Sequence, residues 1–492
     1  MPLTDGLRFP TLSSEVVGFS TEGAPLFFQQ VLYRDLGCAS YVLGDAGEAI
    51  VVDPRWEVGP YLDITRREGL RLTHVLDTHD HADHVSGRRR LARVTGARAC
   101  RPARPGEPHP DDLFPGDEVS AGALRLRALE TPGHRPEHLA FAVSDQSRSS
   151  ATWCVLSGDS MLVGDLARPD LAVDAIGGAQ ALHRSLASLL ALGDHVELWP
   201  AHIGGSLCGG AGLSRKTSST IGFERLHNPL LGADRATFVR GLVQSIPPRP
   251  PNIARIVELN RTLDGPEPSA PGALGTSELR ALLRAGATVI DARDPRAFDD
   301  GHLAGAINLP LTESGVGTRA GWAVGPHEPI VVVASSEEDA TSMADRLQAV
   351  GLWSIRGYAA GDRASWERSG LPVATAVSWD LERLAVGLRR DAVELIDVRE
   401  PREWQAGHVP GSQHLPLHQL GRVATILGNG SAGTAAKRAP GRTTAVACVA
   451  GVRAALAASL IRRAGRQDVV RVAGGGIHDL RELGIGLTTG TL

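Results

Sequence analysis

Short apolar runs separated by turn residues fill the first half of the chain. They include residues 40–44 (SYVLG), 49–54 (AIVVDP), 72–78 (LTHVLDT) and 124–133 (LRLRALETPG). Apolar runs of this length, bounded by Gly, Pro and Asp, indicate strands. Few helical patterns lie between them. Residues 1–262 are therefore expected to form a layered α/β sandwich.

The second half of the chain contains one domain twice. Residues 289–311 and 395–417 are identical at 11 of 23 positions without a gap. Each copy begins with a helical pattern, continues into an apolar strand and later has a second strand that leads into a helix, which predicts a small α/β domain with a mainly parallel sheet. A stretch rich in proline and glycine, residues 263–275, predicts a linker. The two copies then occupy residues 276–376 and 377–492.

Composition narrows the possible partners. A length of 492 residues allows about three domains. The net charge of −4 comes without a basic stripe, which predicts small-molecule partners and no nucleic acid. An N-terminus without signal-peptide features and the lack of a long uncharged apolar run predict a cytoplasmic protein with no membrane partner. The sequence does not specify the oligomeric state and is compatible with a homo-oligomer.

The five cysteines are odd in number and contain no C-x-x-C pair. Neither a disulfide framework nor a structural zinc knot is indicated. Any cysteine with a special role should be a reactive one.

Histidine and aspartate gather in four segments that follow predicted strands. The segment THDHADH is followed by TPGHRPEH, SGDS and WPAH, which together supply His79, His81, Asp83, His84, His134, Asp159 and His202. Side chains at strand ends can converge on one point. A single histidine is usually a surface or packed residue, but seven such residues in this order predict a metal site.

These motifs resemble the metallo-β-lactamase superfamily, which implies an αββα sandwich over about half the chain. Two kinds of site use the same residues. Two metals bound by all seven residues would make a dinuclear zinc thioester hydrolase of the glyoxalase II type. One metal held by His79, His134 and Asp159 would be a facial triad of two histidines and a carboxylate, the geometry of non-haem Fe(II) oxygenases.

The sequences of the segments SGDSMLVGDLARPDL and GGSLCGGAGLSRKTSSTIGFERLHNPLL are similar to those of the persulfide dioxygenases. That resemblance implies one Fe(II) per chain on His79, His134 and Asp159, with O2 and a low-molecular-weight thiol persulfide as substrates. The remaining residues of the motif would orient the ligands or line the pocket; they are His81, Asp83, His84 and His202.

Two further residues have open interpretations. Arg168, with Asp170, would bind carboxylates of a peptide-like thiol or form a structural clamp. Cys208 would face the iron and carry sulfur, or would only pack. We expect no chemistry at the other three cysteines of this half, which are Cys38, Cys100 and Cys154.

In the second repeat, the strand at 443–447 ends on Cys448, and the loop CVAGVR leads into a helix. Backbone N–H groups, the helix N-terminus and Arg453 would stabilise a thiolate there. This arrangement resembles the rhodanese sulfurtransferases and implies that Cys448 carries a persulfide sulfur during transfer.

The first repeat departs from this pattern. Aligned without gaps, Ala334 lies opposite Cys448 and Asp339 opposite Arg453, and the loop SSEED has three carboxylates that would repel anionic donors. We therefore expect an inactive rhodanese-like domain with a structural, spacing or docking role.

The domain order is similar to the three-domain persulfide dioxygenase-sulfurtransferases of bacterial sulfide detoxification. The resemblance implies that a thiol persulfide is oxidised at iron, and that Cys448 exchanges sulfane sulfur between persulfide, sulfite and thiosulfate. The alternative is a dinuclear zinc thioester hydrolase with appended sulfurtransferase domains.

Overall fold

The structure is a computed structural model that describes residues 26–104, 106–171, 174–210, 212–262, 270–311, 314–420 and 442–490. The described residues divide into two compact units. One unit holds the residues up to 247 together with 257–262, and the second holds 248–256 and the residues from 270 onward. Most of the expected linker, 263–269, lies outside the described residues.

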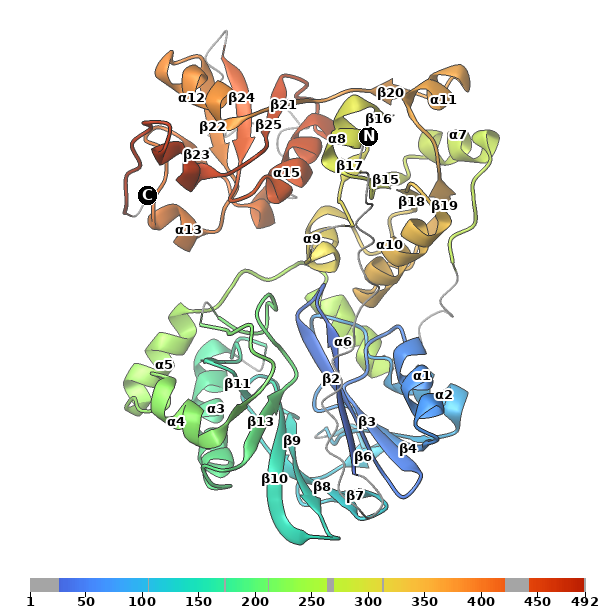
Figure 1. The fold of residues 1–492 in the computed structure, drawn as a ribbon, viewed down its shortest axis with the longest axis vertical. Helices are drawn as coiled ribbons and strands as arrows, with labels where there is room; N and C mark the ends of the chain where they lie inside the picture. The colour runs from blue at the N-terminus through green and yellow to red at the C-terminus, as the bar shows by residue number, and fades with distance from the viewer. Residues whose placement is uncertain are drawn as a thin grey trace, which may run out of the picture. The chain divides into compact units, whose positions relative to one another are not determined.

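The first unit contains two six-stranded sheets (Figure 1). The first sheet has the order β1-β2-β3-β4-β5-β6, with strands Phe27–Tyr33, Cys38–Asp45, Glu48–Val52, Arg71–Leu76, Arg98–Pro102 and Asp112–Leu113. The second has the order β14-β13-β10-β9-β8-β7, with strands Ser219–Thr220, Glu197–Pro200, Ser149–Gly158, Leu139–Asp145, Leu124–Glu130 and Glu118–Ala121. A short hairpin joins β11 (Met161–Leu162) to β12 (Asp165–Leu166).

Helices cover the outer faces of both sheets. Between the sheets, Leu43 and Ile50 of the first meet Leu126 and Phe141 of the second in a buried cluster. On the far side of the first sheet lie α1 (Gly59–Arg67) and α2 (Arg88–Thr95). On the far side of the second lie α3 (Ala175–Leu190), α4 (Ile221–His227) and α5 (Arg235–Gln244). Along the strands, buried and exposed residues alternate, or both faces are buried, as the apolar patterns of the sequence predict. The expected αββα sandwich is confirmed. The helix α6 spans Ile253–Thr262.

The second unit contains two parallel sheets. The sheet of the first repeat has the order β17-β15-β18-β19, with strands Ile307–Asn308, Thr288–Asp291, Ile330–Val333 and Ile355–Ala359. That of the second has the order β21-β25-β24-β22-β23, with strands Val377–Trp379, Val469–Val472, Thr443–Ala447, Val393–Asp397 and Gln413–His414. An antiparallel pair joins β16 (His302–Leu303) to β20 (Val373–Ala374).

Helices follow the strands in both repeats. The first repeat has α7 (Thr276–Arg284), α8 (Pro295–Asp300), α9 (Val316–Ala323), α10 (Glu337–Ala349) and α11 (Arg363–Arg368). The second has α12 (Leu381–Arg389), α13 (Pro401–Gln405), α15 (Val452–Arg463) and the 3-10 turn η1 (Ile477–Arg481). The expected pair of small α/β domains is confirmed.

The repeated D-x-R sequence has the same role in both copies. After β22, Arg399 donates to both carboxylate oxygens of Asp397, and both side chains are fully buried. After β15, Arg293 donates to Asp291 in the same way. Because a buried charge must be paired, this ion pair fixes the loop that follows each strand.

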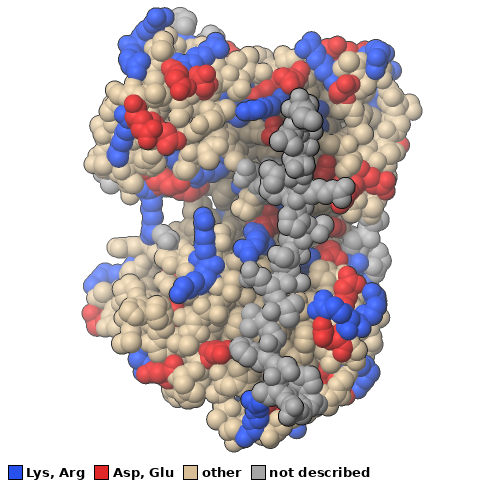
Figure 2. Space-filling model, in the orientation of Figure 1, with Lys and Arg blue, Asp and Glu red and all other residues tan. Residues whose placement is uncertain are grey.

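The charged surface of the described residues is mixed. On the face drawn in Figure 2, basic and acidic side chains are interspersed without a continuous stripe of one sign. Within the described ranges, no helix is both long and apolar enough to span a membrane.

Candidate metal centre and sulfur-transfer loop

The candidate metal ligands of the first unit lie in loops that follow four strands. His79 comes after β4, His134 after β8, Asp159 after β10 and His202 after β13. Each of the four is 0% exposed. The alternation of sheet and loop therefore brings residues that are far apart in the sequence to one buried point.

Three of these residues form a set of free donor atoms. The Nε2 atoms of His79 and His134 lie 3.8 and 3.3 Å from Oδ2 of Asp159, and none of the three atoms has a hydrogen-bond partner among the described residues. Donor atoms that share one ion at about 2.1 Å lie roughly 3 to 4 Å apart. Buried polar atoms without a partner are costly unless something binds them. The set His79, His134 and Asp159 therefore fits one metal ion.

Contacts of the Nδ1 atoms fix the ring orientations of His79 and His134. Nδ1 of His134 donates to the carbonyl of Arg168 at 2.9 Å, which leaves Nε2 as the atom with a lone pair. Nδ1 of His79 lies 2.9 Å from Oγ1 of Thr78. Burial lowers the pKa of both rings, and neighbouring imidazoles lower that of His79 further. Both are therefore neutral, which is the form that binds a metal.

Asp159 is held from two sides. Its Oδ1 accepts a hydrogen bond from Nδ1 of His202 at 2.6 Å, and its backbone N–H donates to Nε2 of His138 at 2.8 Å. Nδ1 of His138 then faces Oγ1 of Thr131 at 2.8 Å. Although burial raises the pKa of Asp159, His202 and His134 lower it more, so the carboxylate is ionised. His138 lies in the segment TPGHRPEH but is not among the site residues predicted from the sequence.

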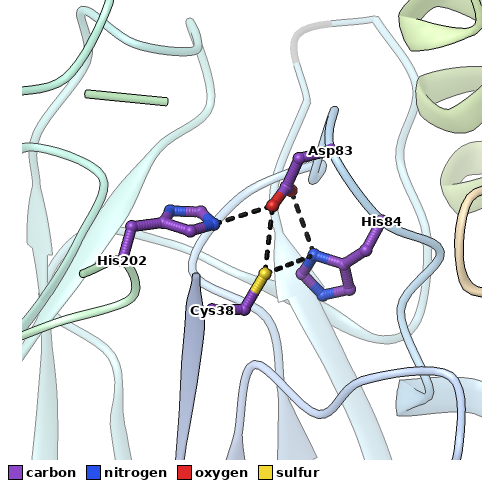
Figure 3. A group of neighbouring side chains, drawn as sticks. All are labelled: Cys38, Asp83, His84 and His202. Atoms are coloured by element: carbon purple, nitrogen blue, oxygen red, sulfur yellow. Dashed lines mark hydrogen bonds and ion pairs between the residues drawn. The ribbon is translucent and has the colours of Figure 1, made fainter. Parts of the chain in front are cut away.

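A second group lies around Asp83 (Figure 3). Nε2 of His202 lies 2.8 Å from Oδ2 of Asp83, and Nδ1 of His84 lies 3.0 Å from Oδ1. The thiol of Cys38 donates to Oδ2 at 3.1 Å. These atoms could hold an ion, but they are hydrogen-bonded to one another, and Nε2 of His84 is buried without a partner among the described residues. Burial raises the pKa of Cys38, followed by the charge of Asp83.

Cys38 lies among polar side chains that its neighbours in the sequence do not indicate. We expected no chemistry there because its neighbours in sequence are apolar or strand-like, yet it faces a buried carboxylate and an imidazole. The other two cysteines are buried in the apolar cluster between the sheets, as expected. An isolated bridge between Cys38 and His202 brings the start of β2 to this group of polar residues.

His81 has one ring nitrogen bound to a carboxylate, while the other, Nδ1, has no hydrogen-bond partner among the described residues. Its Nε2 lies 3.1 Å from Oδ1 of Asp53, and Asp53 also accepts hydrogen bonds from the backbone N–H and hydroxyl of Thr78. Burial lowers the pKa of His81, but Asp53 raises it more, to about 9. Asp53 has a φ of 53°, a strained backbone conformation for a residue with a side chain. Asp53, which directly follows the apolar residues of AIVVDP, is not among the site residues predicted from the sequence.

Asn260 in α6 fastens the motif loop. Its side-chain amide donates to the carbonyls of His81 and His84, and its oxygen accepts from the backbone N–H of Ser86. No pattern in the sequence points to this residue.

Arg168 and Cys208 lie close to the same centre. Arg168 is 2% exposed and donates to Asp170 and to the carbonyls of Leu207 and Pro247, which is the arrangement of a structural clamp. Cys208 is 1% exposed and its sulfur belongs to one group with Asp159 and His202. Burial raises the pKa of this thiol well above its usual value.

In the second unit, Cys448 lies at the start of the expected loop. It follows β24 and is 2% exposed, and the backbone N–H of Gly451 donates to its sulfur at 3.1 Å. Gly451 has a φ of 88° and caps the N-terminus of α15. A second glycine, Gly476, packs against this loop from the segment before η1. A Cβ atom there would lie 1.8 Å from the carbonyl oxygen of Val449, so the close approach requires glycine. The backbone therefore cradles the sulfur at the N-terminus of α15.

Arg453 does not point at the sulfur as a free cation. Its guanidinium donates two hydrogen bonds to Glu403, at 2.6 and 2.7 Å. Burial lowers the pKa of Arg453, but Glu403 raises it more, so the pair is ionised. This bidentate pair ties the first turn of α15 to α13.

The first repeat places Ala334 where the second has Cys448. Val333 pairs with Asp291 as Ala447 pairs with Asp397, and Ala334 and Cys448 come next in their chains. Ser336 caps α10 by accepting from the backbone N–H of Asp339. The acidic residues Glu337, Glu338 and Asp339 lie in the first turn of α10.

Comparisons with known proteins agree with these two units. Residues 33–202 match the metallo-beta-lactamase superfamily, and residues 276–367 and 380–482 match the rhodanese-like domain. The chain joins a metallo-β-lactamase-fold domain to two rhodanese-like domains.

The chain is similar to proteins with different names. The mitochondrial persulfide dioxygenase ETHE1 of Homo sapiens is 28% identical over 264 residues, which cover 50% of this chain and 92% of that protein. A hydroxyacylglutathione hydrolase of Cereibacter sphaeroides is 34% identical over 168 residues, which cover 33% of this chain and 61% of that protein. The solved structure of a metallo-beta-lactamase from Staphylococcus aureus has a TM-score of 0.62 and 27% identity, over 69% of this chain and 99% of that one.

Proposed function

We propose that this chain is a non-haem Fe(II) persulfide dioxygenase and sulfurtransferase. It would oxidise a low-molecular-weight thiol persulfide with O2 and exchange sulfur at Cys448, with sulfite or thiosulfate as product. The observation that carries the proposal is the difference between the two buried groups. The facing atoms of His79, His134 and Asp159 have no partner, whereas around Asp83 the side chains are hydrogen-bonded to one another and, among the described residues, Nε2 of His84 alone has no partner.

Two imidazoles and one carboxylate are the ligands of non-haem Fe(II) sites, and such an iron supplies open positions and redox chemistry for reaction with O2. His79, His134 and Asp159 would hold this iron. His202 and His138 fix the orientation of Asp159 through its side chain and its backbone. The similarity to a persulfide dioxygenase over half the chain supports the assignment.

The second rhodanese-like domain would carry sulfur on Cys448. The thiolate attacks the outer sulfur of a donor, the S–S bond of the donor breaks, and its electron pair leaves on the inner sulfur. A persulfide forms on Cys448, and a nucleophilic acceptor such as sulfite then takes the outer sulfur and returns the thiolate. The N–H of Gly451 stabilises the charge on the cysteine in both steps.

A second candidate function is a dinuclear zinc thioester hydrolase with attached sulfurtransferase domains. Asp83, His84 and His202 lie beside Asp159 and could bind a second ion if their mutual hydrogen bonds were exchanged for metal bonds. The similarity to a hydroxyacylglutathione hydrolase favours this candidate.

Three measurements on the purified chain distinguish the dioxygenase from the hydrolase. They are metal content, O2 uptake on glutathione persulfide, and hydrolysis of a glutathione thioester. About one iron per chain with O2 uptake supports the dioxygenase. Two zinc ions per chain with thioester hydrolysis and no O2 uptake would select the hydrolase.

A further inference from the structure

The helix that follows the Cys448 loop is buried on every side. In α15 the eight consecutive residues 454–461 are buried. They include four alanines in addition to leucine, isoleucine and serine. A helix at the surface of a domain buries one stripe and exposes the rest, so a helix with eight successive buried positions needs partners on opposite sides.

The matching helix of the first repeat is an internal comparison. In α10 the buried residues Ala340, Met343, Ala344 and Leu347 form a single stripe, and a run of more than two buried residues occurs only at the end of the helix, at residues 347–349. The intervening residues are partly exposed. The two helices follow equivalent strands, so the additional burial belongs to α15 and not to the rhodanese-like fold.

The first repeat supplies the second partner of α15. One side of the helix packs against its own strands β24 and β25, and another side packs against β17 of the first repeat (Figure 1). There the backbone N–H of Asn308 donates to Oγ of Ser459 at 3.1 Å, and both residues are 1% exposed. At the end of the helix, Arg463 donates to the hydroxyl of Thr288 at 2.8 Å.

An ion pair connects the first repeat to the sulfur loop. Asp299 of α8 accepts a hydrogen bond from Nη2 of Arg471 in β25 at 2.7 Å, and the two side chains are 11% and 7% exposed. The other terminal nitrogen of Arg471 lies beside the loop, because a Cβ atom on Gly451 would be 3.9 Å from Nη1. Gly451 in turn donates to the sulfur of Cys448.

The repeat itself indicates that Asp299 serves the other domain. In the gapless match of the two copies, Asp299 lies opposite Gln405, whereas Glu403, which binds Arg453, lies opposite Ala297. Asp299 on α8 therefore has no acidic counterpart in the second copy, and Glu403 on α13 has none in the first. Both carboxylates pair with arginines of the active domain.

We propose that the inactive rhodanese-like domain is a positioning element of the active one: Asp299 fixes Arg471 beside Gly451, and β17 covers α15, so that the loop keeps its shape around Cys448. The inference rests on the proposed sulfur transfer at Cys448. A buried arginine that loses its carboxylate is left as an unpaired charge and leaves its position. Asp299 is thus a positioning residue, which acts on Cys448 through Arg471 and Gly451.

The test uses the full chain with Asp299→Asn, and with Asp300→Asn as the matched control because Asp300 is the exposed neighbouring acid. Sulfur transfer from thiosulfate to cyanide is measured as kcat and KM. Metal content and O2 uptake are measured on the same samples. Asp299→Asn is expected to lower kcat by roughly tenfold, as a small misplacement of reacting groups does, with little change in KM. Asp300→Asn should match the wild type.

Two more variants separate positioning from a general loss of stability. Asp299→Glu keeps the charge and should recover part of kcat. If Asp299 acts through Arg471, the double variant Asp299→Asn/Arg471→Gln should be no slower than Arg471→Gln alone. Hydrogen exchange of residues 448–458 should be faster in Asp299→Asn than in Asp300→Asn.

Equal kcat values for Asp299→Asn and Asp300→Asn would overturn the inference, as would additive losses in the double variant. A wild-type chain that transfers no sulfur would instead reject the proposed sulfurtransferase. The two failures are therefore distinct.

Discussion

His138 accepts the backbone N–H of Asp159 on its Nε2 atom, at 2.8 Å. The same ring faces the hydroxyl of Thr131 with Nδ1, and burial lowers its pKa to about 3. A neutral ring in one orientation thus fixes the backbone of a candidate metal ligand. His138 is not among the residues expected from the signature of the superfamily.

We expect His138→Ala to lower metal affinity by about 10- to 100-fold, the usual cost of losing a residue that orients a ligand. His138→Gln should retain most of the affinity, because its amide oxygen can accept the Asp159 N–H. Competition with a chelator measures both. Equal affinities in His138→Ala and the wild type would show that Asp159 needs no such support.

His134→Ala should lose both bound iron and O2 uptake, because two remaining protein ligands are too few to retain Fe(II). Metal analysis and an oxygen electrode measure the two effects. His195→Ala is the control, since His195 is an exposed histidine of the same unit. Full iron content in His134→Ala would remove this residue from the ligand set.

Cys448→Ser should abolish sulfur transfer and leave iron content and O2 uptake on a free persulfide largely intact. Serine is nearly isosteric, but its hydroxyl is not ionised at neutral pH and cannot hold sulfane sulfur. Chromatography should show a changed ratio of sulfite to thiosulfate. The neighbouring Val449→Ala, at a side chain that is 43% exposed, is the control. Loss of O2 uptake with iron still bound would mean that the two sites depend on each other.

Ala334→Cys in the Cys448→Ser chain should not restore transfer. A cysteine at position 334 would be followed by a short loop that ends at Ser336, the N-cap of α10. Acidic residues occupy the first turn of that helix. These carboxylates oppose an anionic donor. Cyanide-dependent transfer close to the wild-type rate would contradict the inactive assignment.

The Glu403–Arg453 pair should make the active domain sensitive to acid. Burial raises the pKa of Glu403, but its hydrogen bonds with Arg453 lower it more, so the net shift is below the ordinary value. A group with a lowered folded pKa binds fewer protons when folded, so its stabilisation is complete above the ordinary pKa of about 4.3 and declines as the pH falls below that value. Thermal unfolding from pH 7 to pH 3 should show a smaller decline in Glu403→Gln. An unchanged slope would mean that the pair is too exposed to contribute.

The sequence predicts those parts of the fold and the site that depend on local order. Strand ends carry His79, His134, Asp159 and Cys448, so their loops could be placed from the apolar runs before them. The sandwich and the two repeats followed from the same patterns and from the resemblance.

Contacts between distant segments could not be read from the sequence. Asn260 reaches the carbonyl of His84 across 176 residues, and Arg471 reaches Asp299 across 172. Cys38 contacts Asp83 across 45 residues, at a point where it also forms a bridge with His202. Such contacts depend on sheet order and helix packing, which apolar periodicity does not specify.

The burial of α15 has a consequence for how the two copies can change. A larger side chain at any of residues 454–461 meets packed neighbours, and a smaller one leaves a cavity. In α10 the partly exposed positions between the buried stripe can accept many side chains at little cost. The duplicated helices should therefore differ in the substitutions they tolerate: α10 can accept changes on its surface, while a change in α15 requires a matching change in the domain that faces it.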